Sequence, residues 1–280
     1  TSPEPESPDL LDDPDLDVTT ARLEPPLEAV TRPLSQKNQP PLLPRESHFT
    51  FGEASDQGKV RVNNQDAILC SFFTSVSVDD RPNFGLFIVA DGMGGHHDGE
   101  KASALAVRIM AQHVIATVFL PMLDSDAHSD AERPTIAEAM SAAVQLANKR
   151  VFTEIPDGGT TLTAVAIMSD LAHFVHVGDS RAYIITDRDI NQITRDHSLV
   201  QRMIEIGTLD PADSEDHPQR NVLYRAIGQN ETLEVDAITR RLHPNDQVMI
   251  CSDGLWGLVP DDGLREIVNA AADPQTACDA

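Results

Sequence analysis

The stretch FGLFIVADGMGGHHDGE, Phe84–Glu100, joins an apolar run to a single carboxylate, Asp91, and then to several glycines. Its apolar part is typical of a buried β-strand, and apolar residues at helical spacing follow from Lys101. A carboxylate at the end of a buried strand costs desolvation energy unless it is paired or bound to a metal ion. Glycine lets backbone carbonyls and water approach closely. The stretch therefore predicts a strand, a polar site and a helix, in that order.

The same pattern occurs twice more along the chain. The run FVHV leads into Asp179, and the run VMIC leads into Asp253, each beside a glycine. If these acids converge with Asp91, they form an all-oxygen site that suits Mg²⁺ or Mn²⁺, whereas nothing supports a Cys or His zinc site. An ordinary Asp-Gly turn is the better explanation of any one of them alone, but a weaker one for all three.

The order of the expected elements predicts an α+β fold with mostly antiparallel sheets, because helices are grouped rather than alternating with strands. Long amphipathic helices are expected at 101–120 and 135–155, and shorter ones at 198–207 and 261–272. Strands are expected at 66–73, 83–90, 160–169, 171–178, 181–186, 233–242 and 246–252.

Composition separates a tail from a globular body. Residues 1–45 hold ten of the 19 prolines, and the first 17 residues carry seven acids and no base, so we expect 1–45 to be a disordered tail or linker. The globular part is expected to span 46–280. A net charge of −24 argues against nucleic acid and anionic lipid as partners. No apolar run approaches a membrane span, and three unpaired cysteines, expected to be buried thiols, suit a reducing cytoplasm.

Several other residues have both a functional and an ordinary interpretation. Arg61 lies five residues before Asp66, and an arginine fork suits a phosphate dianion, although a lone arginine is usually a solvated surface residue. His96 and His97 are placed for general acid catalysis, but exposed loop positions are the better explanation. We expect His197 to be a structural cap, and Trp256 to belong to the core.

Seven ordered motifs carry a family resemblance. They are NNQDA, VADGMGG, GTTLTAV, HVGDSRAYII, RDHSLVQRMIEIG, NVLYRAIG and CSDGLWGLV. Together they resemble the metal-dependent type 2C protein phosphatases, particularly the bacterial serine/threonine members, from about Phe51 to the chain end. The resemblance implies two antiparallel β-sheets packed as a sandwich and flanked by helices, in α-β-β-α layers.

The resemblance also implies roles for individual residues. Asp91 would bridge two Mn²⁺ or Mg²⁺ ions, with the Gly92 carbonyl on one of them and Asp66 holding the shell of the other. Asp253 would ligate the first ion and, together with Asp179, a third and weaker one. Arg61 would bind the substrate phosphate, and the segment 198–228 would form a flap beside the site. The implied reaction is hydrolysis of phospho-Ser/Thr by a water that bridges the ions.

The chain departs from the family pattern in two places near the site and at its end. Gln65 stands where many members have Glu, and Met93 replaces a histidine of eukaryotic members. The family closes with an Asp-Asn pair and a final strand, so the resemblance implies that the catalytic domain, 46–280, lacks its C-terminal end and one aspartate ligand. The alternative to an active enzyme is a pseudophosphatase or regulatory module that keeps the fold without efficient catalysis.

The resemblance implies phosphorylated proteins as partners, including a Ser/Thr kinase and its substrates. A dedicated phosphatase for an anti-sigma-factor antagonist would share the chemistry and differ only in its partner. We expect a cytoplasmic monomer that acts in bacterial signalling.

Overall fold

The computed structural model describes residues 49–59, 63–74, 82–94, 98–123, 133–214 and 217–280. The described unit spans Phe49–Ala280. The expected tail, 1–45, lies outside the described residues, as do Arg61, His96 and His97.

Two antiparallel sheets form the centre of the unit. The larger has the strand order β1-β2-β4-β5-β8, with the short β3 paired to β2, and the smaller has the order β7-β6-β9. The strands are β1 (Asp66–Phe73), β2 (Phe84–Gly94), β3 (Gly158–Thr160), β4 (Leu162–Met168), β5 (Leu171–Val177), β6 (Arg181–Ile185), β7 (Ile190–Gln192), β8 (Asp236–Arg241) and β9 (Gln247–Cys251).

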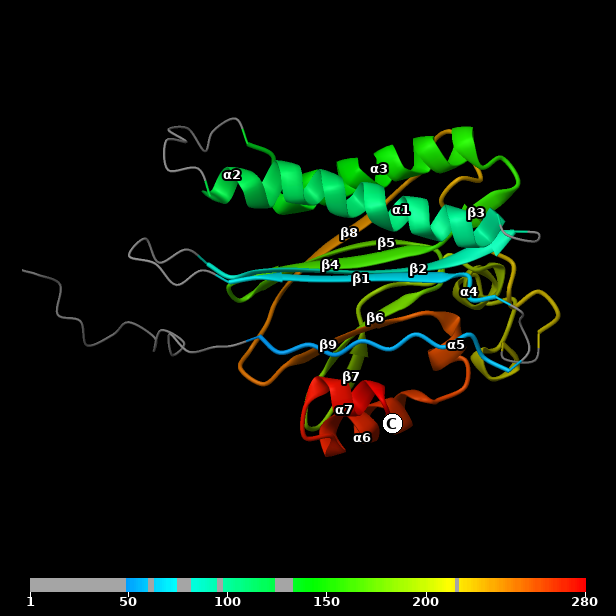
Figure 1. Ribbon diagram of the computed structural model, residues 1–280. Coiled ribbons are helices and arrows are strands. Elements are labelled where there is room, and N and C mark those ends of the chain that lie inside the picture. The colour runs from blue at the N-terminus through cyan, green and yellow to red at the C-terminus, as the bar shows by residue number, and fades with distance from the viewer. Residues whose placement is uncertain (1–48, 60–62, 75–81, 95–97, 124–132, 215–216) are drawn as a thin grey trace, which may run out of the picture. The chain divides into compact units, whose positions relative to one another are not determined.

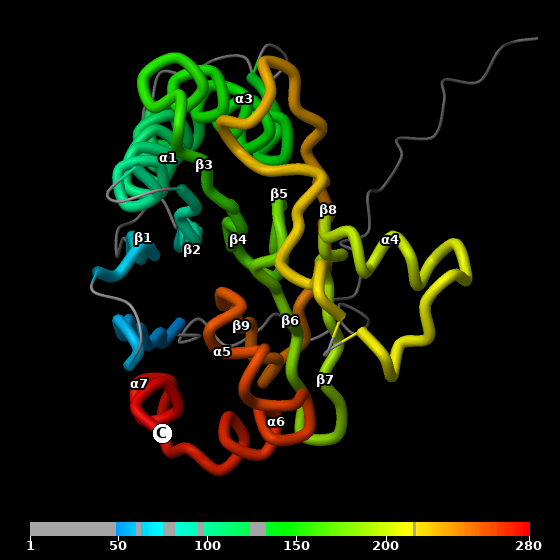
Figure 2. The backbone as a smooth tube through the Cα atoms, turned by 90° about the vertical axis from the view of Figure 1, so that its right-hand side faces the viewer, coloured from blue at the N-terminus to red at the C-terminus, as the bar shows by residue number. Residues whose placement is uncertain are grey.

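Helices lie on the two outer sides of the paired sheets. Figure 1 shows the long helices above the larger sheet and the C-terminal helices below the smaller one, and Figure 2 shows the same four layers from the side. The helices are α1 (Asp98–Val114), η2 (Ile115–Phe119), α2 (Leu120–Leu123), α3 (Ile136–Glu154), α4 (Leu199–Glu205), η4 (Pro211–Asp213), α5 (Asp253–Trp256), α6 (Asp261–Ala270) and α7 (Pro274–Cys278). The expected α-β-β-α sandwich is confirmed.

Successive side chains of a strand point to opposite faces of its sheet, and this alternation explains how each sheet packs on two layers. In β4, Leu162 and Ala164 join the cluster under the long helices, whereas Val165 joins the cluster between the sheets. In β6, Ala182 lies in the cluster between the sheets, and Tyr183 packs on the opposite face against α6. Three apolar clusters thus separate four layers.

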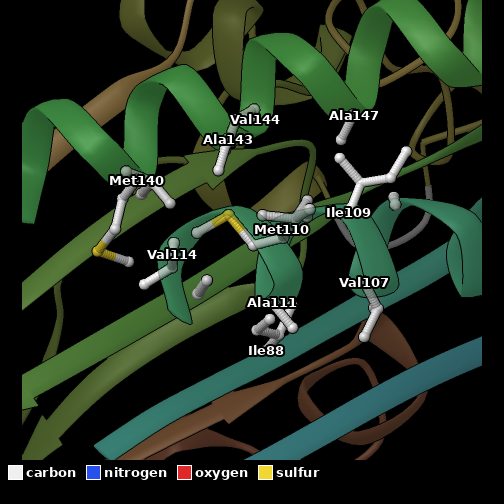
Figure 3. Packing of buried hydrophobic residues seen from close by; sticks show 14 of the residues in the cluster. Ile88, Val107, Ile109, Met110, Ala111, Val114, Met140, Ala143, Val144 and Ala147 are labelled. Carbon is white, nitrogen blue, oxygen red and sulfur yellow. The ribbon is translucent and has the colours of Figure 1, made fainter. Parts of the chain in front are cut away.

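The helices α1 and α3 pack on each other and on the larger sheet. Figure 3 shows Met110 and Val114 of α1 near Met140 and Ala143 of α3, with Ile88 of the sheet below. The segment 98–123 is long and apolar enough to cross a membrane by length and composition alone. This differs from the expectation that no run approaches that length. Because nearly half of its apolar window is buried against α3 and the sheet, the segment has the pattern of a core helix.

Several expectations about strand ends, short elements and burial were wrong. The strand expected to end near Asp91 continues as β2 to Gly94, because Gly92, Met93 and Gly94 pair with β3. The short elements β7, α5 and α7 were not expected, since three to five residues are too few for a periodic signal. Cys278 is exposed rather than buried.

Candidate metal centre

Asp91 lies within β2, where hydrogen bonds to Thr160 and Thr161 hold both its backbone N–H and its carbonyl. It is directly opposite Asp66 in the β1–β2 pair. Its N–H donates to the Thr161 hydroxyl (2.9 Å), while its carbonyl accepts from the Thr161 N–H (2.9 Å) and from the Thr160 hydroxyl (2.9 Å). The backbone that presents the Asp91 carboxylate is therefore fixed before any ligand arrives.

Gly92 sits where two backbone segments approach it too closely for a side chain. A Cβ atom at this position would lie 2.2 Å from the Gly99 carbonyl oxygen at the start of α1 and 2.6 Å from the Gln65 carbonyl oxygen. The Gly92 N–H donates to that Gln65 carbonyl (3.0 Å). The glycine after Asp91 is thus required by packing, and it joins β1, β2 and α1 at the site.

Asp179 and Asp253 reach the same region from the other sheet. Asp179 is 8% exposed and lies in the tight turn between β5 and β6, where Gly178 has a φ of +112° that favours glycine. Asp253 is the first residue of α5, directly after Ser252 at the end of β9. The Ser252 hydroxyl donates to Asp66 Oδ2 (2.8 Å), which connects β9 to β1 at this end of the sandwich.

The four carboxyl groups act on one another electrostatically. Burial raises the pKa of Asp91, and the negative charges of Asp66 and Asp253 raise it further. With a side-chain hydrogen bond to Asp253 and the charge of Asp179, the pKa of Asp91 reaches about 8. Burial first, and then Asp253, raise the pKa of Asp179 to about 7. Ionisation of Asp91 and Asp179 beside these neighbours is therefore unfavourable near neutral pH unless a positive charge compensates it.

The donor set fits a hard divalent cation. Every candidate ligand offers oxygen, as Mg²⁺ and Mn²⁺ prefer, and an ion would relieve the repulsion that raises the Asp91 and Asp179 pKa values. Among the described residues, no group of three or more His, Cys, Asp or Glu side chains is already arranged to hold an ion. The oxygens are instead engaged in the Asp66–Ser252 and Asp91–Asp253 hydrogen bonds. Ion binding would exchange those bonds for metal–oxygen contacts.

The structure brings together five of the six residues singled out from the sequence: Asp66, Asp91, Gly92, Asp179 and Asp253. The sixth, Arg61, lies outside the described residues.

One expectation for a residue near the site was wrong. His197 is not a cap: it is 1% exposed, and its Nδ1 accepts a hydrogen bond from the Gly178 N–H (3.1 Å), while Ser198 caps α4. Trp256 is partly buried and packs against the apolar cluster of Tyr183, Ile185 and Cys251, and its indole N–H donates to the Asp179 carbonyl (3.0 Å). The supporting residues Thr161 and Ser252, which lie directly beside strands, were also missed, because a hydroxyl side chain carries no sequence signal of its partner.

The burial of His176, three residues before Asp179, predicts that the stability of the fold depends on pH. His176 is fully buried, with Nε2 3.0 Å from the Arg195 carbonyl and Nδ1 2.9 Å from the Thr163 hydroxyl. Burial, followed by the proximity of His197, lowers its pKa to about 3. The unfolded chain binds a proton below about pH 6.5 and the folded chain does not, so stability is lost as the pH falls from about 6.5 towards 3.

At pH 5, His176 should lower the free energy of unfolding by about 2 kcal/mol relative to pH 7. The measurement is urea unfolding at pH 7 and pH 5 in the wild type and in His176→Gln, whose pH dependence should be shallower by that amount. An NMR titration of the His176 ring with a midpoint near its ordinary value would contradict the prediction.

Comparison with known proteins supports the same assignment. The family model described as Protein phosphatase 2C matches residues 59–278. The serine/threonine phosphatase stp of Listeria monocytogenes is 32% identical over 216 residues, which cover 77% of this chain and 81% of the relative. The serine/threonine protein phosphatase PstP of Mycobacterium tuberculosis is 32% identical over 224 residues, 77% of this chain and 38% of the relative.

Solved structures agree with these relatives. The PPM Ser-Thr phosphatase MsPP from Mycobacterium smegmatis, in complex with cacodylate, has a TM-score of 0.62 and 33% identity over 81% of this chain and 87% of that protein. The catalytic domain of PstP, solved with two manganese ions, has a TM-score of 0.62 and 29% identity over 81% and 86% of the two chains. With its sandwich fold and its strand-end aspartates, this chain belongs to the protein phosphatase 2C family.

Proposed function

We propose that the chain hydrolyses phosphoserine and phosphothreonine esters in proteins with the help of divalent metal ions. The observation that carries the proposal is the convergence of three aspartates, from β1, the β5–β6 turn and α5, on the half-buried Asp91 of β2. A binding module would have no need of so costly an arrangement, and no observation favours the pseudophosphatase alternative.

The proposal assigns a role to each residue of the site. Asp91, the Gly92 carbonyl, Asp66 and Asp253 would hold two core Mn²⁺ or Mg²⁺ ions, and Asp179 with Asp253 would hold a third, weaker ion. Bound there, the ions would neutralise phosphate charge and lower the pKa of a water for attack on phosphorus. Arg61 is proposed to bind the substrate phosphate through its guanidinium fork.

The chain's own charge makes substrate binding depend on the cation. A phosphate dianion close to Asp66, Asp91, Asp179 and Asp253 would be repelled by those carboxylates that are ionised in the metal-free protein, since like charges in a partly buried site are weakly screened. The same carboxylates attract divalent cations. The rigid backbone of Asp91 then places its carboxylate without reorganisation, which is the protein's contribution to positioning.

A phosphopeptide assay tests the proposal. With Mn²⁺ or Mg²⁺, the chain should release inorganic phosphate from a phosphothreonine peptide, and excess EDTA should abolish the release. Peptide binding, followed by fluorescence anisotropy, should likewise require the metal. Metal-dependent binding without any phosphate release would favour the pseudophosphatase, and release that persists in EDTA would exclude the proposed chemistry.

The natural substrates of the proposed activity would be phosphorylated proteins made by a Ser/Thr kinase. The kinase partner, the monomeric state and the cytoplasmic location stay predictions from the sequence.

A further inference from the structure

The β5–β6 turn and helix α5 carry two of the proposed metal ligands on separate segments. Asp179 lies in the turn, and Asp253 begins α5, a helix of only four residues. An ion shared by the two carboxylates requires a fixed separation between the turn and the helix. A direct contact between the two segments would supply it.

Trp256 makes that contact. It is the last residue of α5, and its indole N–H donates to the backbone carbonyl of Asp179 over 3.0 Å. The hydrogen bond therefore joins the peptide unit of one proposed ligand to the helix that begins with the other.

Arg181 holds the indole ring in place from the other side. Its guanidinium carbon lies 3.6 Å from the centre of the Trp256 ring, in cation–π geometry. Three hydrogen bonds of 2.8–3.2 Å fix the same guanidinium on Asp196, which is 5% exposed and also accepts from Gln192 (3.0 Å). An arginine side chain that is partly buried and makes bidentate hydrogen bonds to a carboxylate has little freedom to move.

Hydrogen bonds to His197, the residue after Asp196, hold the turn itself. The His197 N–H donates to the Gly178 carbonyl (2.7 Å), and the Gly178 N–H donates to His197 Nδ1 (3.1 Å). With Gly178 held on one side of Asp179 and Arg181 on the other, the turn is rigid, and Trp256 transmits its position to α5.

We propose that Trp256 is a positioning residue for the metal ion shared by Asp179 and Asp253, with Arg181 and Asp196 orienting its ring. The inference rests on the proposed function, because it requires those two aspartates to bind an ion. Its consequence is specific. Loss of the indole N–H should weaken the binding of that ion, while the chemistry at saturating metal is retained.

Trp256→Phe is the sharpest test, because phenylalanine keeps an aromatic face for Arg181 but has no N–H for the Asp179 carbonyl. We expect the Mn²⁺ concentration for half-maximal turnover to rise about three- to tenfold, as for the loss of one neutral hydrogen bond. Turnover at saturating Mn²⁺ and the KM for a phosphothreonine peptide should stay close to the wild-type values. Calorimetric Mn²⁺ titration should show the same weakening without any assay of activity.

Asn269→Ala is the matched control, because the Asn269 amide also donates to a backbone carbonyl, that of Thr186 (2.9 Å), between α6 and the far end of β6. It removes a hydrogen bond of the same kind, together with the one that Asn269 Oδ1 accepts from Gln247 (3.3 Å), and should leave the Mn²⁺ dependence unchanged. An equal shift in Asn269→Ala would mean that general loosening causes the effect, and would overturn the positioning role.

Trp256 is also the single tryptophan of the chain, so its fluorescence reports on this turn. Mn²⁺, which is paramagnetic, should quench it in the wild type, and Asp179→Asn should reduce the quenching at a given Mn²⁺ concentration. If Asp179→Asn changes neither the quenching nor the Mn²⁺ dependence of turnover, the metal role of Asp179 fails, and the inference fails with it. If Asp179→Asn weakens Mn²⁺ binding but Trp256→Phe does not, the positioning role alone is wrong.

Discussion

Asp91→Asn should reduce metal-dependent phosphate release by about a thousandfold or more, because the electrostatic effect of bound ions dominates this kind of chemistry. The amide keeps the shape of the carboxylate but lacks the negative charge that would hold the ions. Calorimetry should show the corresponding loss of Mn²⁺ affinity. Turnover and Mn²⁺ affinity near the wild-type values would contradict the assignment of Asp91 as the central ligand.

The same variant should not be less stable than the wild type. In the metal-free wild type, burial and the neighbouring carboxylates raise the pKa of Asp91 to about 8, so its ionisation opposes folding as the pH rises from about 4 to 8. A neutral amide removes that cost, and metal-free Asp91→Asn should melt at a higher temperature at pH 8. Asp187→Asn, at a side chain that is 83% exposed in a turn, is the matched control and should change neither property.

Gly92→Ala should lower the free energy of unfolding by about 1–3 kcal/mol or more, as for overpacking in a rigid interior. The new methyl group would meet the Gly99 carbonyl oxygen at 2.2 Å and the Gln65 carbonyl oxygen at 2.6 Å. Both contacts are backbone atoms that cannot rotate away, so β1 or the start of α1 must shift. Because Asp91 and Asp66 lie beside this contact, Mn²⁺ binding should weaken together with stability. Urea unfolding and calorimetry measure the two effects.

Gly254→Ala is the matched control, because it also follows a proposed ligand, Asp253. A Cβ atom there would have only the Ser252 hydroxyl within 4 Å, at 3.7 Å, and the position lies inside α5. Alanine is the better helix former, so stability should be unchanged or slightly higher. If both alanine variants were equally tolerated, the close packing around Gly92 would not be a constraint on the site.

Strong periodicity made the long elements predictable. The expected strand 66–73 coincides with β1, and the helix expected at 135–155 is α3 with Thr135 as its cap. Short elements could not be predicted, because one turn of helix or three residues of strand contain no repeat. For the same reason α5, which carries Asp253, was expected only as the end of a strand.

The candidate ligands were visible in the sequence because each acid interrupts or follows an apolar run, an arrangement that is costly unless it serves a purpose. Their mutual placement was not visible. Asp66 lies opposite Asp91 only through the register of β1 on β2, and Asp179 meets Asp253 only because β6 pairs with β9. Strand pairing between distant segments depends on the packing of the whole sandwich.

The sequence by itself determined the α+β class, the buried strands and the set of acidic oxygens, because hydrophobic periodicity and the cost of burying a charge are local properties. Only the tertiary structure decided which groups support those acids. The Thr161 hydroxyl on Asp91, the Ser252 hydroxyl on Asp66 and the Trp256 indole on the Asp179 carbonyl join residues that are 70, 186 and 77 positions apart. Such hydrogen bonds form only after the layers have packed, because side-chain partners at that separation are chosen by the geometry of the folded chain.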